Sequence, residues 1–140
     1  MNPSDDAIRR ILTDTKVIAV VGWSAKAMRP SHGVAAYLAR RGYRVIPVNP
    51  GLAGQVTAWG ETVRASLSDI TDPVDMIDLF HNSDAVGPVV DEALVALPGL
   101  KTVWMQLGVV NEAAAVKARA AGLDVVMDRC PAIEIPRLLG

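Results

Sequence analysis

A short segment near the start of the chain combines the residue types that bind a phosphate. Its residues follow the apolar run 17–21 and are, in order, Gly22, Trp23, Ser24, Lys26, Arg29 and Pro30. Gly22 allows a tight turn at the end of a strand, and Pro30 favours the start of a helix. The amides and positive dipole end of that helix, together with Lys26 and Arg29, would bind an anion. An ordinary tight turn is the alternative, because the third glycine of the dinucleotide-binding pattern is missing.

Three other expected strand ends carry residues that would contact the same ligand, namely Asn49 and Pro50, then Phe80, His81 and Asn82, then Gln106, Gly108 and Val109. Asn49 would bond a ribose or an adenine edge and Pro50 would pack on the adenine face, unless the pair is a plain turn. Phe80 would stack on a base and His81 would bond a phosphate, unless they are a core phenylalanine and a solvated histidine. No acidic residue ends the second strand to hold a ribose, which argues against NAD.

Two further residues have chemistry that the pattern leaves open. Cys130, the only cysteine, lies between Arg129 and Pro131, so the start of a helix would favour a reactive thiolate there. A small, buried, structural cysteine is the alternative. Asp78, on the same strand face as Phe80, is expected to order loop amides rather than to react. No catalytic residue, catalytic triad or metal site is predicted.

Apolar runs alternate with amphipathic segments along the chain. Strands are expected over 16–21, 43–48, 74–80, 101–106 and 123–127. Helices are expected from Ser4 or Asp5 to Thr13, covering the sheet edge, and over 30–41, 83–97 with a break near Gly87-Pro88, 111–121, and from Pro131. The long loop 52–66 is expected to hold a helical turn around 61–64.

This alternation predicts an α/β fold with a doubly wound, mainly parallel sheet, Rossmann-like and in three layers, α/β/α. In such folds ligands bind outside the carboxyl ends of the strands, near the point where the strand order reverses. The four candidate loops would therefore meet at one edge of the sheet.

Composition sets the class of protein. The 140 residues are 51% hydrophobic and 21% charged, which fits one ordered domain over 1–140. The net charge of -1 argues against binding to nucleic acid or to an anionic membrane surface. No apolar run approaches the ~20 residues that cross a bilayer, so a cytoplasmic protein is expected, as a monomer or small homo-oligomer. One cysteine excludes an internal disulfide.

Six sequence blocks, taken together and in this order, resemble the small bacterial CoA-binding proteins of the YccU-like kind: 18–24, 29–31, 42–50, 74–80, 103–109 and 127–134. The resemblance runs from about Ile8 to Leu138. It implies a stand-alone Rossmann-like domain, related to the CoA-binding part of the succinyl-CoA synthetase alpha subunit, whose ligand is coenzyme A or an acyl-CoA. By this resemblance the phosphate end is lined by 22–24, Lys26, Arg29 and Pro30, the adenosine side by Asn49 and Pro50, and the remaining rim by 80–82 and 106–109.

The chain departs from that family at two cations. The family often has Lys after the second-strand Pro and Arg after the strand-three aromatic, where this chain has Gly51 and His81. Each lost charge-assisted hydrogen bond would weaken CoA binding by about 1.5–3 kcal/mol.

Three functions are compatible with these residues. Non-catalytic binding of CoA or acyl-CoA is favoured, and enzymatic activity is left open. One alternative is a redox or acyl-carrier role in which Cys130 reacts with CoA. The other is a nucleotide-responsive interaction protein whose exposed apolar surface would include Trp59 or Trp104.

Overall fold

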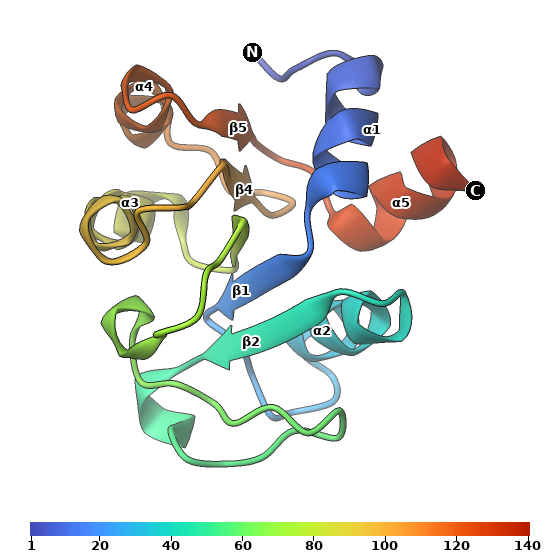
Figure 1. Ribbon diagram of the computed structural model, residues 1–140, viewed down its shortest axis with the longest axis vertical. Helices are drawn as coiled ribbons and strands as arrows, with labels where there is room; N and C mark the ends of the chain where they lie inside the picture. The colour runs from blue at the N-terminus through green and yellow to red at the C-terminus, as the bar shows by residue number, and fades with distance from the viewer.

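The computed structural model describes Met1 to Gly140 and contains one sheet of five parallel strands (Figure 1). The strand order is β2-β1-β3-β4-β5, with bounds β1 (Val17–Val21), β2 (Arg44–Val48), β3 (Met76–Leu79), β4 (Thr102–Met105) and β5 (Asp124–Val126). All four strand pairings are parallel. The apolar runs are therefore buried on both faces of the sheet, and the predicted doubly wound fold is confirmed.

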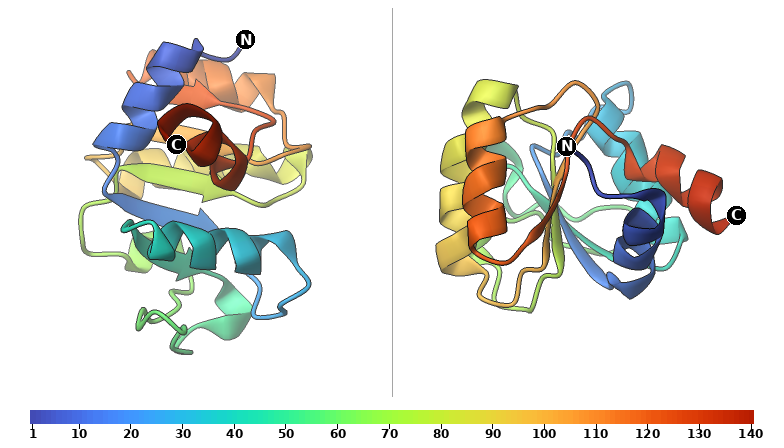
Figure 2. Two further views of the ribbon diagram at one scale, coloured as in Figure 1. Left: turned by 90° about the vertical axis from the view of Figure 1, so that its right-hand side faces the viewer. Right: turned by 90° about the horizontal axis from the view of Figure 1, so that it is seen from above.

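Five α-helices cover the sheet, with bounds α1 (Asp5–Asp14), α2 (Pro30–Arg40), α3 (Val86–Ala96), α4 (Glu112–Ala120) and α5 (Pro131–Leu139). Helices α3 and α4 lie on one face and α1, α2 and α5 on the other, which gives the three predicted layers (Figure 2). Ser4 caps α1, where its hydroxyl accepts from the Ala7 amide at 3.2 Å. None of these helices has both the length and the apolar character needed to cross a membrane.

Each face of the sheet has its own apolar cluster. A cluster of 22 buried residues joins the sheet to α3 and α4, and one of 14 joins it to α1, α2 and α5. Ile8, Ile11 and Leu12 of α1 belong to the second cluster. The expectation that this first helix covers the sheet edge is wrong, because its apolar stripe packs on the sheet face beside α5.

Trp59 and Trp104, the two tryptophans expected on an exposed apolar surface, are partly and fully buried, respectively. Trp104 is fully buried in the second cluster, and its indole N–H donates to the Arg129 carbonyl at 2.9 Å. Trp59 is half-buried, and its indole N–H donates to the Val45 carbonyl at 2.9 Å. The prediction for Trp104 is wrong because the centre of a parallel sheet is covered on both faces.

Two local predictions also need correction. Residues 61–64 are extended rather than helical: Thr62 pairs with Val56 and Arg64 with Val48. The β-branched pair 62–63 favours extended backbone, and Gly60 turns the chain back with a φ of 88°. The break expected near Gly87-Pro88 lies earlier, where the 3₁₀ turn Ser83–Ala85 precedes α3. Pro88 fits the first turn of α3 because an amide there has no partner within the helix.

The order of the strands reverses between β1 and β3. The chain passes from β1 through α2 to β2 on one side, and then returns to place β3 on the other side of β1. The loops after β1 and β3 consequently leave neighbouring strand ends and lead to helices on opposite faces of the sheet (Figure 2). This is the place at which a ligand crevice is expected in a doubly wound sheet.

Asp78 lies in the middle of β3 with no exposed surface and no hydrogen bond to either carboxylate oxygen. Its strand neighbours are Val20 and Trp104. The prediction that Asp78 orders loop amides is therefore wrong, since it lies below the loops, inside the sheet. Burial raises the pKa of this carboxyl well above its ordinary value of 3.8.

An Asp78→Asn variant should lose part of the pH dependence of stability. Because the pKa of Asp78 is higher in the folded than in the unfolded chain, folding takes up a proton, and the free energy of unfolding falls as pH rises above 3.8. Removing this group should flatten the fall by about 1.4 kcal/mol per pH unit across the range where Asp78 titrates. Urea denaturation at steps of pH measures this, with Asp84→Asn as an exposed control. Identical pH profiles of wild type and Asp78→Asn would contradict a protonated Asp78.

Candidate functional site

Gly22 lies at the closest approach of the loops that follow β1 and β3. Its φ is 85°, and an ideal Cβ added to it would lie 3.4 Å from both the His81 ring carbon Cε1 and the Phe80 carbonyl oxygen. Its amide donates to the Val48 carbonyl at 3.0 Å, which joins the same turn to the end of β2. Glycine is therefore favoured at this position mainly because the positive φ strains any residue that has a Cβ. The sequence predicted the turn but not the contact with His81.

A cavity of about 320 Å³, called here the central cavity, opens between this turn and α2. Eight predicted residues line it: Gly22, Trp23, Ser24, Lys26, Arg29, Pro30, Asn49 and Phe80. Lys26 and Arg29 are exposed, and neither has an acidic side chain within 4.0 Å. No side chain caps the first turn of α2. The cavity thus offers two cations and a helix N-terminus to an anion.

The loop around the central cavity is held by its own side chains. The Ser24 amide donates to the Ser31 hydroxyl at 2.9 Å, and the Lys26 amide donates to the Ser24 hydroxyl at 3.1 Å. Trp23 is buried, with its ring 6.0 Å from that of His32 in a stacked arrangement. Sequence reasoning missed Ser31 as a loop anchor, although a short polar residue in a first helical turn is the usual signal of one.

Asn49 joins the loops after β1 and β2. Its side-chain amide donates to the Trp23 carbonyl at 2.7 Å, and its side-chain oxygen accepts from the Gly51 amide at 2.9 Å. One N–H and one oxygen lone pair are left over for a ligand. Asn49 and Pro50 also line a cavity of about 360 Å³, the β2-side cavity, together with Ser66 and Glu92, which the sequence did not single out.

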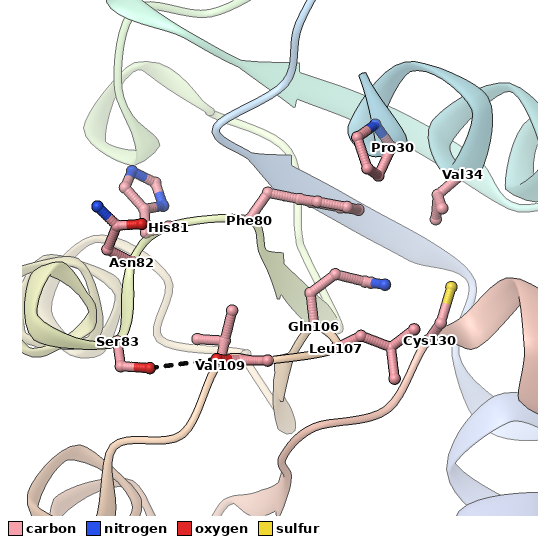
Figure 3. A pocket seen from close by; sticks show the side chains of 11 residues that line it. Pro30, Val34, Phe80, His81, Asn82, Ser83, Gln106, Leu107, Val109 and Cys130 are labelled. Atoms are coloured by element: carbon pink, nitrogen blue, oxygen red, sulfur yellow. Dashed lines mark hydrogen bonds between the residues drawn. The ribbon is translucent and has the colours of Figure 1, made fainter. Parts of the chain in front are cut away.

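A third cavity of about 550 Å³, the β4-side cavity, lies between the ends of β3 and β4 and the starts of α2 and α5 (Figure 3). It is lined by seven predicted residues, Pro30, Phe80, His81, Asn82, Gln106, Gly108 and Val109. Ser83 also lies there, at the end of the candidate loop 80–83, whereas sequence reasoning did not place Val34 or Cys130 there, because they come from α2 and the start of α5. Only the fold shows that they meet.

Hydrogen bonds fix the rim of the β4-side cavity. The Gly108 amide donates to the Asp128 carboxylate at 2.7 Å, and the Val110 amide donates to the Ser83 hydroxyl at 3.0 Å. Asp128 itself has a left-handed backbone, with a φ of 56°, which aspartate tolerates better than most residues. Asp128 and Ser83 therefore shape this rim from the flanking loops.

His81 is half-buried and lines both the β2-side and the β4-side cavities. Burial lowers its pKa below the ordinary value of 6.5, so its ring is neutral at neutral pH. Its ring nitrogen Nδ1 is buried without a hydrogen-bond partner. His81 is thus a polar group without a protein partner between two cavities.

The three cavities form one continuous series along the carboxyl ends of the strands. Gly22 and Asn49 line both the β2-side and central cavities, while Pro30 and Phe80 line both the central and β4-side cavities. All fourteen residues predicted for the site line at least one of the three. The structure therefore brings the predicted residues together into an elongated crevice with cations near its middle.

A parallel sheet with cavities and cations at the carboxyl ends of its strands defines a doubly wound α/β protein with its ligand site at the topological reversal. Residues 16–136 match the family model described as CoA binding domain. The chain belongs to this family of CoA-binding domains, as the resemblance of its sequence blocks implied.

Known relatives cover nearly the whole chain. The uncharacterized protein YneT of Bacillus subtilis (strain 168) is 37% identical over 129 residues, which are 92% of each chain. A hypothetical protein from Pyrococcus horikoshii OT3 has a solved structure that is 40% identical, with a TM-score of 0.90 over 99% of this chain and 94% of that one. The structure of cell-free ID.343 from Thermus thermophilus is 38% identical, with a TM-score of 0.90 over 97% and 99%.

Replacing Gly22 by Ala should destabilise the protein. A left-handed backbone costs a residue with a Cβ about 1–2 kcal/mol, and this cost decides the outcome because the added Cβ would only touch His81 and Phe80 at 3.4 Å. Gly33→Ala is the matched control, because Gly33 lies within α2 with no atom within 4 Å of an added Cβ. That control should gain about 0.5–1 kcal/mol. Urea denaturation compares the two variants, and equal stabilities would contradict the constraint at Gly22.

Proposed function

We propose that the protein binds coenzyme A or an acyl-CoA along the carboxyl ends of its strands, without chemical turnover. The observation that carries this proposal is the continuous series of three cavities, with unpaired Lys26 and Arg29 near its middle, in a member of the CoA-binding domain family. Coenzyme A is itself elongated, with a nucleotide at one end, phosphates next to it and a thiol at the other end. The order of chemical groups in the ligand matches the order of the cavities.

The phosphates are assigned to the central cavity. Lys26 and Arg29 face no acidic partner there, and the start of α2, which no side chain caps, adds a positive dipole end. A guanidinium next to a phosphate forms short, charge-assisted hydrogen bonds. The flanking Ser24–Ser31 bond holds the loop in place before any ligand arrives, which lowers the entropy cost of binding.

The adenosine is assigned to the β2-side cavity. The remaining amide N–H of Asn49 would bond the ribose or base, and Pro50 would pack against the base. Gly51 supplies no cation at this end, so the phosphates depend on Lys26 and Arg29.

The pantetheine arm is assigned to the β4-side cavity, which Pro30 and Phe80 connect to the phosphate position. The lining of this cavity contains only two ionisable side chains, His81 and Cys130. Neither is paired with a second acid or base in the cavity, and general acid–base catalysis needs such groups within hydrogen-bond reach of the reacting atoms. Binding alone is the function that these residues support best.

Calorimetric titration with CoA tests the proposal, with ADP and NAD as comparison ligands. Arg29→Ala should weaken CoA binding by about 10- to 100-fold, the equivalent of one charge-assisted hydrogen bond. Arg40→Ala is the matched control, because Arg40 lies in the last turn of the same helix and should leave binding unchanged. Absence of CoA binding, or equal affinities in wild type and Arg29→Ala, would contradict the proposal.

CoA affinity should also depend on His81 and pH. Burial keeps the imidazole neutral in the free protein, whereas the ribose 3′-phosphate of a CoA whose adenosine lies in the β2-side cavity, which His81 also lines, would favour the imidazolium and raise its pKa. Binding would then take up a proton, so affinity should rise as pH falls from about 8 to 6, by at most about tenfold per pH unit. Titrations of wild type and His81→Gln over this range isolate the effect, since the ligand's own ionisation is common to both. Parallel profiles would show that His81 does not face a phosphate.

A further inference from the structure

Cys130 lies in the wall of the β4-side cavity and not in the apolar interior. It is 6% exposed and belongs to neither of the two apolar clusters. Its sulfur points into the cavity (Figure 3), and its side chain makes no capping bond at the start of α5. The thiol is therefore sheltered from bulk solvent but accessible from the cavity.

Gln106 gives a second, independent indication of a ligand at this place. Its side chain is buried, with 5% exposed, and its side-chain oxygen has no hydrogen-bond partner. In Figure 3 the nitrogen end of the Gln106 carboxamide points into the cavity, toward the side on which the Cys130 sulfur lies. A buried polar oxygen without a partner costs about 1–3 kcal/mol, so it marks a place where a donor is missing.

The two side chains together match the free end of a pantetheine arm. That end has an amide N–H, then two methylene groups, then sulfur. The amide of that end would bond the Gln106 carboxamide while the ligand sulfur lies against Cys130. The remaining wall, which includes Pro30, Val34 and Phe80, is apolar and suits the methylene groups.

We propose that Cys130 exchanges with disulfides of coenzyme A and holds one CoA covalently; this inference rests on the proposed CoA binding. The Cys130 thiolate attacks the CoA sulfur of a symmetrical CoA disulfide. A bond forms between Cys130 and that sulfur as the original S–S bond breaks, and the departing CoA thiolate takes up a proton. Cys130 is oxidised and the departing CoA is reduced, so no other reductant or oxidant is needed. A second thiol reverses the step.

Intact-mass measurement without reductant tests this exchange. Pre-reduced protein incubated with CoA disulfide should gain the mass of one CoA moiety, dithiothreitol should remove it, and Cys130→Ser should gain nothing. The rate should saturate with CoA disulfide and exceed that with oxidised glutathione by about tenfold or more, because the nucleotide is bound first.

Gln106→Leu separates positioning from simple thiol reactivity. It should slow exchange with CoA disulfide by about tenfold and slow exchange with oxidised glutathione much less, since only CoA is held by its nucleotide so that its amide meets Gln106. Equal slowing with both disulfides would overturn the role of Gln106 in holding the ligand.

Calorimetry of Cys130→Ser with reduced CoA distinguishes failure of this inference from failure of the proposed function. If CoA binds but no adduct forms, or if the adduct forms no faster than with oxidised glutathione, covalent capture is overturned and CoA binding stands. If CoA does not bind to wild type or Cys130→Ser, the proposed function fails, and this inference fails with it.

Discussion

The close approach of the β1 and β3 loops at Gly22 is the constraint on which the site depends. Gly22 has a φ of 85°, which residues with a Cβ rarely adopt, and an added Cβ would touch the His81 ring and the Phe80 carbonyl at 3.4 Å. The Gly22 amide also bonds the end of β2, and Asn49 returns a bond to the Trp23 carbonyl. The ends of β1, β2 and β3 are thereby held together by these contacts, and α2 with its cations is positioned beside the crevice. The constraint follows from the strand order, because β1 and β3 are neighbours at the reversal.

Polar groups without partners are concentrated near this surface. Of the four residues with buried, unbonded side-chain atoms, three line the cavities: Trp23, His81 and Gln106. The fourth, Asp78, lies in β3, two residues before Phe80. Such groups reduce stability unless something bonds to them, and folded proteins retain few of them. Trp23, His81 and Gln106 lie at the strand ends, where a bound ligand could supply the missing hydrogen bonds and so stabilise the protein. This agrees with a binding surface that is formed before the ligand arrives.

The sequence predicted the architecture because its signals were local. Continuous β-branched runs mark buried parallel strands, and Ser4, Pro30 and Pro131 mark helix starts. Parallel strands place their carboxyl ends at one edge, so the fourteen site residues could be predicted to lie together. Contacts between distant elements were not predictable: Asp128 with Gly108, Ser83 with Val110, and Cys130 beside Gln106 depend on how α5 and two loops pack. The helical turn expected at 61–64 failed for a similar reason, because Arg64 bridges back to β2.

The most direct measurement of the central claim is a crystal structure of the reduced protein grown with coenzyme A. The account predicts density for the ligand along the strand ends, with its diphosphate between Lys26 and Arg29 at the start of α2, its base beside Pro50 and its sulfur near Cys130. Coenzyme A bound at any other surface, or with its phosphates away from the central cavity while the protein is saturated, would contradict it.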